Sequence, residues 1–276
     1  MGTIIELRSV SKRFGGFLAV NDCSLSVTAG SVTGLIGPNG AGKSTLFNMV
    51  AGNLVPTSGT ILLDGEDVTG LEAHELFSRG LLRTFQIAHE FSHMTVTENL
   101  MMVPSRQSGE SLVEAWFRPA RVAREETAIR RKAEEVLDFL KITRVKNELA
   151  GNLSGGQKKL LELGRTMMAD AKIVLLDEIA AGVNRTLLND LASNIERLNQ
   201  ELGYTFFVIE HDMDLIARLC DPVIVMAAGS VMTEGHIADI QKNQAVIEAY
   251  FGGSPTGNAT TISAAAEAAR GAGAPA

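Results

Sequence analysis

The sequence predicts an α/β fold in which helices cover both faces of a mainly parallel sheet. Two nearly all-apolar segments, KIVLLDE and YTFFVIEHD, are separated by a helical pattern from about Thr186 to Leu202. Apolar strands that alternate with helices are typical of parallel sheets buried on both faces. Residues 3–36 contain short apolar runs between turn signals, whereas residues 86–168 are mostly helical in pattern. A strand-rich start and a helical middle part therefore accompany the parallel core.

Composition excludes several classes of protein. The 276 residues are 45% hydrophobic, which is ample for a large globular core. The net charge of −7 argues against a basic surface, so we expect no nucleic-acid partner. Cys23 and Cys220 lie far apart without metal-ligand spacing, which fits a reducing cytosolic setting. No apolar run reaches the roughly 18 residues of a membrane span, so any membrane role would act through a partner.

The first part of the chain predicts three strands, a helix and a further strand. The runs TIIELRSV, FLAVNDCSLSV and SVTGLIG have the composition and turn boundaries of strands. STLFNMVAG then predicts a helix that stops at Gly52. PTSGTILLDGEDVT predicts a turn followed by another strand.

The middle part predicts helices joined by an exposed connection. TVTENLMMV opens with a capping pattern, in which Thr97 precedes Leu100 and Glu98 lies in the first turn. PSRQSGES predicts an exposed connection. From Ala123 to Leu140 apolar residues recur at helical spacing with charged residues between them, namely Ile129, Ala133, Val136, Leu137 and Leu140.

The last part predicts a hairpin, a helix and a tail. VIVMAAGSVMTEG turns at Gly229, and QAVIEAYF predicts a terminal helix. Residues 254–276 are rich in Ala and Gly and low in bulky apolar residues, which favours a mobile tail. A short docking helix is the alternative for this segment.

A glycine-rich loop between a strand and a helix predicts a nucleoside triphosphate site. GPNGAGKS fits the pattern G-x-x-x-x-G-K-[ST], in which backbone N–H groups and a helix N-terminus surround phosphates. Lys43 would reach the β- and γ-phosphates, and the Ser44 hydroxyl would ligate Mg²⁺. The residues expected to hold the nucleotide here are Gly37, Pro38, Asn39, Gly40, Ala41, Gly42, Lys43, Ser44 and Thr45.

A pair of acids at the end of an apolar strand belongs with this loop. KIVLLDE ends in Asp177 and Glu178, at the edge of a parallel sheet where ligands bind. Asp177 would hold Mg²⁺, and Glu178 would orient or deprotonate the attacking water. The alternative is a helix start capped by acids.

A second possible phosphate cradle, LSGGQ, covers residues 153–157 at the start of a predicted helix. Ser154 can cap this helix, and glycines follow it. An ordinary serine-capped helix is the alternative. Together with the glycine-rich loop, the motif resembles the ATP-binding subunits of ABC transporters, in which two cassettes meet head to tail. The resemblance implies that Ser154, Gly155, Gly156 and Gln157 contact the ATP of a neighbouring cassette.

The resemblance also implies an architecture. We expect a P-loop NTPase (RecA-like) core with an antiparallel β subdomain and an inserted helical subdomain at about 87–168. Residues 1–253 would form this single ABC ATP-binding domain, followed by the tail at 254–276.

Three further residues match markers of the family. Phe14 in SKRFGG corresponds to the aromatic residue that stacks on adenine, although a strand-end core aromatic is the alternative. Gln86 in RTFQ matches the glutamine that senses Mg²⁺ and water, and otherwise reads as a surface glutamine. His211 matches the histidine that contacts the γ-phosphate, where a structural histidine is the alternative. The implied catalytic residues are Glu178, His211 and Gln86, and the implied metal ligands are Ser44, Gln86 and Asp177.

The sequence departs from the family pattern after the catalytic glutamate. Ile179 stands where proline is usual, Asn184 where aspartate is usual, and Arg185 where proline is common. Asparagine keeps hydrogen bonding but loses charge. These differences affect communication across the cassette pair, not ATP binding.

Several phrases look most like the cassettes of branched-chain amino acid importers, namely SKRFGGFLAV, RTFQI, TVTENL, DEIAAGVNR, VIEHDMDLI and VIEAYFGG. Membership of this branch implies polytopic permease subunits, a second cassette and, indirectly, a periplasmic solute-binding protein as partners. The cassette pair would be a heterodimer, or else a homodimer, at the cytoplasmic face of the inner membrane.

Three alternatives to this function remain: the cassette of an exporter, a non-transport ABC ATPase, and a P-loop kinase or GTPase. The cassette of the lipopolysaccharide exporter is also similar. A non-transport ABC ATPase is the second alternative, but translation factors of that kind usually have two cassettes, and repair ATPases carry long coiled coils. No N-K-x-D motif of a GTPase occurs.

Overall fold

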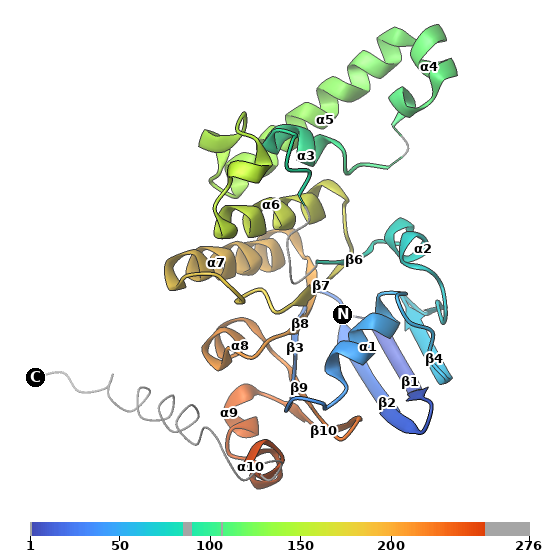
Figure 1. The fold of residues 1–276 in the computed structure, drawn as a ribbon, viewed down its shortest axis with the longest axis vertical. Coiled ribbons are helices and arrows are strands. Elements are labelled where there is room, and N and C mark those ends of the chain that lie inside the picture. Colours follow the sequence, from blue (N-terminus) through green and yellow to red (C-terminus); the bar gives the residue numbers. More distant parts are fainter. Residues whose placement is uncertain (1, 85–89, 106, 252–276) are drawn as a thin grey trace, which may run out of the picture.

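The computed structural model describes residues 2–84, 90–105 and 107–251, and a six-stranded sheet runs through it in the order β10-β9-β3-β8-β7-β6 (Figure 1). The strands β6 (Leu81–Arg83), β7 (Ile173–Asp177), β8 (Thr205–Ile209), β3 (Val32–Ile36) and β9 (Val223–Ala227) are parallel. Every residue of β3, β7 and β8 is buried, which confirms the expected parallel sheet covered on both faces. The sequence analysis did not predict the short edge strand β6.

The hairpin predicted near the C-terminal end is present. β10 (Ser230–Gly235) pairs antiparallel with β9, and the turn uses Ala228 and Gly229, both with positive φ. The terminal helix α10 (Gln244–Phe251) follows α9 (Ile237–Ile240). The predicted tail, residues 254–276, lies outside the described residues.

A second, antiparallel sheet contains the strand-rich start of the chain. It has the order β2-β1-β4-β5. Its strands are β1 (Thr3–Phe14), β2 (Phe17–Thr28), β4 (Ser58–Leu63) and β5 (Glu66–Asp67). The helix α1 (Lys43–Val50) lies between this sheet and the parallel one, where the ring of Phe47 packs 4.9 Å from that of Phe207. The helix that follows the glycine-rich loop is therefore held between two sheets.

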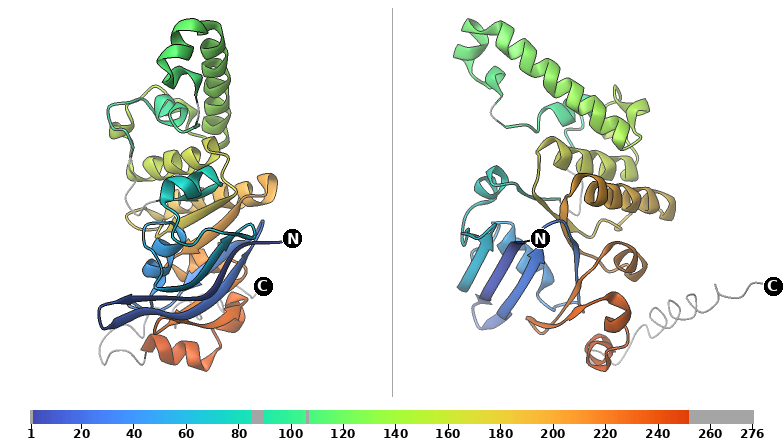
Figure 2. Two further views of the ribbon diagram at one scale, coloured as in Figure 1. Left: turned by 90° about the vertical axis from the view of Figure 1, so that its right-hand side faces the viewer. Right: turned by 180° about the vertical axis from the view of Figure 1, so that it is seen from behind.

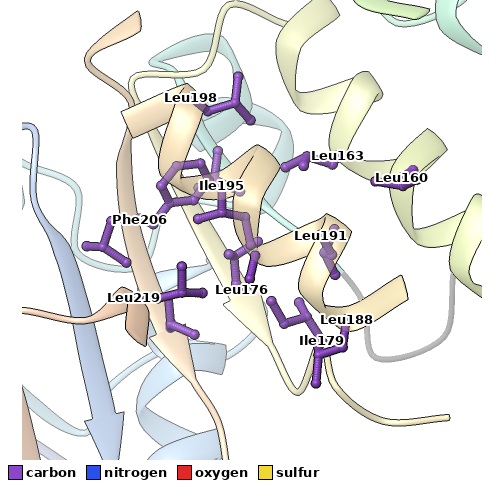
Figure 3. Close-up of a cluster of buried hydrophobic side chains, with 14 of the residues drawn as sticks. Leu160, Leu163, Leu176, Ile179, Leu188, Leu191, Ile195, Leu198, Phe206 and Leu219 are labelled. Atoms are coloured by element: carbon purple, nitrogen blue, oxygen red, sulfur yellow. The ribbon is translucent and has the colours of Figure 1, made fainter. Parts of the chain in front are cut away.

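The other face of the parallel sheet is covered by α6 (Gly155–Met168), α7 (Arg185–Leu202) and α8 (Met213–Leu219). Figure 3 shows the apolar stripe of α7 facing both the sheet and α6; its members are Leu188, Leu191, Ile195 and Leu198. Burial of such side chains stabilises the fold by about 1.5–3 kcal/mol each. Residues that alternate along β7 and β8 point to the two cores, so α1 and α6 lie on opposite faces of one sheet.

The middle part of the chain is helical, as predicted. α3 (Val96–Met101) and α5 (Pro119–Phe139) pack on α6, and α4 (Leu112–Phe117) precedes α5 at its outer end (Figure 2). The expected cap at Thr97 is wrong: Thr95 caps α3 in a capping box with Glu98, whereas the Thr97 hydroxyl donates to the carbonyl of Lys146. The cap lies two residues earlier because Thr95 is the last residue with extended backbone.

The remaining short helix, α2 (Ala73–Ser78), leads into β6 beside the helical part. None of the helices in the described part of the chain is long and apolar enough to cross a membrane.

Candidate nucleotide site

Three adjacent strands of the parallel sheet end at one edge, and each is followed by predicted site residues. The order β3-β8-β7 places the glycine-rich loop, His211 and the Asp177–Glu178 pair in neighbouring positions. The carboxyl ends of parallel strands are where ligands bind in open α/β sheets. The fold therefore brings together the loop, the acids and the histidine.

The glycine-rich loop has a backbone that other residues could not adopt. Gly37 has φ 151°, and a Cβ there would lie 2.1 Å from the carbonyl oxygen of Met226. Gly42, the N-cap of α1, has φ 96°, and a Cβ would lie 2.5 Å from the carbonyl oxygen of Ala19. Successive bare N–H groups at a helix N-terminus form an anion nest. The loop thus fits a nucleotide phosphate by the shape of its own backbone.

Lys43 places a buried positive charge in this loop. Its side chain is nearly fully buried, and its Nζ donates to the carbonyls of Gly37 at 2.7 Å and Pro38 at 3.0 Å. Burial lowers the pKa of Lys43 below its usual value, while the negative charge of Glu178 acts in the opposite direction. A buried cation that donates to two neutral carbonyls of a glycine-rich loop is well suited to an anionic ligand.

The C-terminal helix also supports the loop. The Tyr250 ring packs against the core, and the Gly37 backbone hydrogen bonds to its hydroxyl. Burial raises the pKa of Tyr250 to about 12, so it remains a neutral phenol at physiological pH. No motif of the sequence pointed to Tyr250, because it lies within an ordinary helical pattern.

Asp177 lies in an ion pair that the sequence analysis did not foresee. Its Oδ2 accepts from Nη2 of Arg83 at 2.6 Å, and both side chains are largely buried. The other guanidinium arm donates to Oδ1 of Asn48 on α1 at 2.6 Å. Arg83 therefore ties the acid that ends β7 to the helix that follows the phosphate loop.

Glu178 and His211 form the most direct contact between predicted catalytic groups. The Oε1 atom of Glu178 lies 3.0 Å from Nε2 of His211. Glu178 has φ 49°, which is uncommon for a non-glycine residue, and its N–H donates to the carbonyl of Ile209 at 3.0 Å. The side chains remain 26% and 48% exposed, so both can meet a ligand at the sheet edge.

Glu210 is a buried carboxyl group that the sequence analysis overlooked. It precedes His211 and accepts backbone N–H groups of Ala180 at 2.7 Å and His211 at 3.0 Å. Burial raises the pKa of Glu210, and these hydrogen bonds, with one from Asp212, oppose the rise. Its carboxyl group thus ties the segment after Glu178 to the segment of His211. The sequence did offer a signal for Glu210, because it is an acidic residue directly after the apolar run of β8.

Phe14 is exposed at the end of β1, next to the turn that leads to β2. It is 48% exposed and pairs across the hairpin with Phe17, which is 65% exposed. Lys12 Nζ lies 5.3 Å from the centre of the Phe14 ring. The strand-end core aromatic considered above is therefore ruled out, and the ring is free to stack on a planar ligand.

The second cradle is exposed and capped by its own side chains. The Ser154 hydroxyl accepts from the Gln157 N–H, and the Gln157 side chain accepts from the Ser154 N–H at 2.9 Å. Ser154 and Gly155 are exposed, whereas Gly156 is buried. A Cβ on Gly156 would lie 2.3 Å from Leu187, so this glycine is required by the close packing of α6 on α7. Because α1 and α6 lie on opposite faces of the sheet, the two cradles are separate places in one chain.

The departures after Glu178 have clear local roles. The Asn184 side chain caps α7 by accepting from the Leu187 N–H at 3.0 Å, as an aspartate would. Arg185 pairs with Asp212 and Asp214 beside the histidine segment. Gln86, the remaining predicted catalytic and metal residue, lies outside the described residues.

Comparisons with known proteins agree with this arrangement. The family model described as "ABC transporter" matches residues 20–181, more than half of the chain. The chain is 40% identical to the "Probable branched-chain amino acid transport ATP-binding protein LivG" of Archaeoglobus fulgidus, covering 90% of this chain and 95% of that protein. It is 39% identical to the "High-affinity branched-chain amino acid transport ATP-binding protein BraF" of Pseudomonas aeruginosa, covering 90% and 98%.

Solved structures show the same fold. The crystal structure of the ADP conformation of an ATP-binding cassette of an ABC transporter superimposes with a TM-score of 0.77 at 36% identity. It covers 91% of this chain and 100% of that chain. The predicted architecture, a P-loop core with an antiparallel β sheet and added helices, is confirmed. The chain therefore belongs to the ABC transporter family, in which it is an ATP-binding cassette that hydrolyses ATP to power transport.

Proposed function

We propose that this cassette energises an importer of branched-chain amino acids or related small polar solutes, as one half of a cassette pair. The observation that supports the pair is the position of the two cradles on opposite faces of one sheet. Both cradles of one chain could contact the same nucleotide only if the hydrophobic core between them unfolded. A head-to-tail pair supplies one cradle from each chain.

Within one chain, the loop from Gly37 to Thr45 holds the nucleotide phosphates and Phe14 stacks on the adenine. Glu178 orients the attacking water, and His211, whose Nε2 lies 3.0 Å from the Oε1 of Glu178, contacts the γ-phosphate. Gln86 completes the catalytic set. Ser154, Gly155, Gly156 and Gln157 contact the nucleotide of the partner cassette.

Ser44, Asp177 and Gln86 hold Mg²⁺. Magnesium usually takes one or two protein ligands beside substrate phosphates and water, so a hydroxyl and a carboxylate at this edge suit it. When bound there, Mg²⁺ would supply positive charge beside the phosphates. Arg83, which pairs with Asp177, fixes the direction of that carboxylate.

The permease subunits dock on a hollow between α2 and the helical part of the chain. This hollow has a volume of about 540 Å³ and is lined by residues of α2, β6 and α6 and by the segments around Phe91 and Val103. Closure of the cassette pair moves the helical subdomain, about residues 87–168 of the 1–253 domain, and this motion is passed to the membrane subunits.

The cargo class rests on the relatives, two of which are named as branched-chain amino acid transport proteins. The permease and a periplasmic binding protein choose the solute, while the cassette acts from the cytoplasmic face of the inner membrane. The second cassette is a different chain, which makes the pair a heterodimer.

Affinity purification from the native membrane in mild detergent, followed by mass spectrometry, tests this proposal. Two polytopic subunits, a second cassette and a solute-binding protein that binds branched-chain amino acids are the expected result. Recovery with lipopolysaccharide-export components, or only as a chain without membrane partners, would contradict it. Phe77→Asp in the hollow should abolish the co-purification of permease subunits, whereas Phe17→Asp, on the exposed β1–β2 hairpin, should not.

A further inference from the structure

The short helix α4 presents a continuous apolar surface to the outside of the molecule. Leu112, Val113, Trp116 and Phe117 are 89%, 65%, 82% and 76% exposed. Their spacing of one and four residues places them on one side of the helix. Figures 1 and 2 show α4 at the outer end of α5, at one extreme of the molecule. Contiguous exposed apolar surface of this kind marks a contact with another surface.

The orientation of α4 is fixed by polar contacts on its other side. The Ser111 side chain caps the helix, and Glu114 pairs with Arg118 and Arg121 at the start of α5. Glu125 of α5 accepts from the Ser108 N–H at 3.0 Å and from its hydroxyl at 2.9 Å. The ion pairs therefore hold the polar side against α5 and direct the apolar side outward.

The charge around α4 differs from that of the chain. Residues 107–132 hold six basic and four acidic residues, a net charge of +2, in a chain of net charge −7. Trp, Phe and Leu on one side of a short helix with arginines beside it are the composition of segments that lie in the headgroup region of anionic bilayers. Because α4 is a projecting tip, it suits a deformable surface better than a shaped protein pocket.

The position of α4 in the molecule also suits a contact with a membrane. In both figures α4 projects on the side of the molecule that carries α2, and α2 lines the hollow described above. A membrane on the side of the hollow would therefore face the tip. We propose that α4 inserts Leu112, Val113, Trp116 and Phe117 into the surface of an anionic phospholipid bilayer, to which the net positive charge of the surrounding segment attracts it.

The chain offers a direct probe, since Trp116 is its one tryptophan. The purified full-length protein should show a blue-shifted Trp116 emission with vesicles of phosphatidylglycerol and phosphatidylcholine. Lipids brominated on the acyl chains should quench that emission. Phosphatidylcholine alone should give a weaker response, and added salt should reduce the response to the anionic vesicles.

Matched variants separate insertion from a general charge effect. Leu112→Ser and Phe117→Ser should each weaken partitioning roughly tenfold, because each removes a large apolar side chain from the buried set. Phe17→Ser, at another exposed phenylalanine on the β1–β2 hairpin, should leave partitioning unchanged. Each of these side chains is exposed, so the variants should fold.

An unchanged Trp116 spectrum at saturating anionic lipid would overturn the proposal. An equal response of Phe17→Ser and Phe117→Ser would do the same. If lipid has no effect but Trp116→Ala loses the permease subunits on purification, the surface binds protein instead. The vesicle assay needs no partner cassette, permease or ATP, so its failure and the failure of the proposed transport function are distinguishable.

Discussion

The two cradles of this chain are both built at the start of a helix, yet they differ in how complete they are. The loop before α1 uses glycines in conformations closed to other residues and encloses the buried Lys43. The start of α6 has ordinary extended backbone at Ser154, is exposed, and carries a capping box in which the Gln157 N–H donates to the Ser154 hydroxyl. The first is built to hold an anion alone. In the function proposed above, the second becomes a ligand site only when the partner cassette delivers its nucleotide.

The largest effect is expected at the catalytic edge of the first cradle. Glu178→Gln should slow ATP hydrolysis by about 10²–10⁴-fold while ATP still binds, because the attacking water loses its orienting carboxylate. The amide keeps the size of the side chain and a partner for His211. ATPase assays of the cassette pair and calorimetric ATP binding check this. Glu201→Gln on α7 is the control. Near-normal turnover of the Glu178 variant would contradict the assignment of Glu178 as the residue that orients the attacking water.

The second cradle should respond differently. Ser154→Arg should leave ATP binding by the same chain unchanged but abolish the ATPase activity of the cassette pair, because a long side chain blocks the approach of the partner nucleotide. Ser154→Ala removes the cap, at about 1 kcal/mol of helix stability, and the hydroxyl's own contact with the nucleotide, but adds no bulk, so it should lose less ATPase activity than the arginine variant. Unaltered ATPase activity of the arginine variant would show that this cradle has no role in the pair.

The first cradle should also show a specific contribution from stacking. Phe14→Ala should weaken ATP binding by about 1–3 kcal/mol, or roughly 5- to 150-fold in Kd, if adenine stacks on the exposed ring. Phe17→Ala, its cross-strand neighbour, should have little effect. Calorimetry with ATP and with tripolyphosphate distinguishes the base from the phosphates, because the loss should appear with ATP only. Equal losses for both variants would contradict the stacking role.

The smallest expected effect is on the pH dependence of the free energy of unfolding, and it comes from Glu210, whose carboxyl group bonds to the segments that carry Glu178 and His211. Burial raises its pKa in the folded state above the ordinary value of 4.5. As pH rises from 4.5 through the folded pKa, the unfolded state has released a proton that the native state still holds, so the free energy of unfolding falls. Glu210→Gln removes this dependence. Urea unfolding across this pH range should show the variant gaining stability relative to wild type, and parallel curves would contradict the raised pKa.

The sequence predicted the parts of the fold that local patterns determine. Apolar runs located β7 and β8, and the glycine spacing located the loop before α1, because these features depend on neighbours in the chain. The same patterns missed the three-residue strand β6, which is defined by its pairing with β7. They also misplaced the cap of α3, although only Thr95, and not Thr97, has a glutamate three residues later, as the capping box requires.

For the site, the sequence predicted residue types but not their supports. The motifs located Lys43, Glu178 and His211, all at one sheet edge. The Arg83–Asp177 pair joins residues 94 positions apart, and Glu210 bonds to Ala180 across two strands. Such contacts depend on the order of strands, which a single sequence does not state. The apolar face of α4 went unnoticed because six residues are too short for a periodic pattern.

The measurement that tests the account most directly is the mass of the assembly formed with nucleotide. Glu178→Gln, mixed with its partner cassette, should form a two-cassette particle by light scattering only when ATP and Mg²⁺ are present. Adding Ser154→Arg to the same chain should return it to single cassettes, although ATP still binds. A nucleotide-independent particle, or one that survives the arginine, would contradict the claim that the second cradle serves the neighbour's ATP.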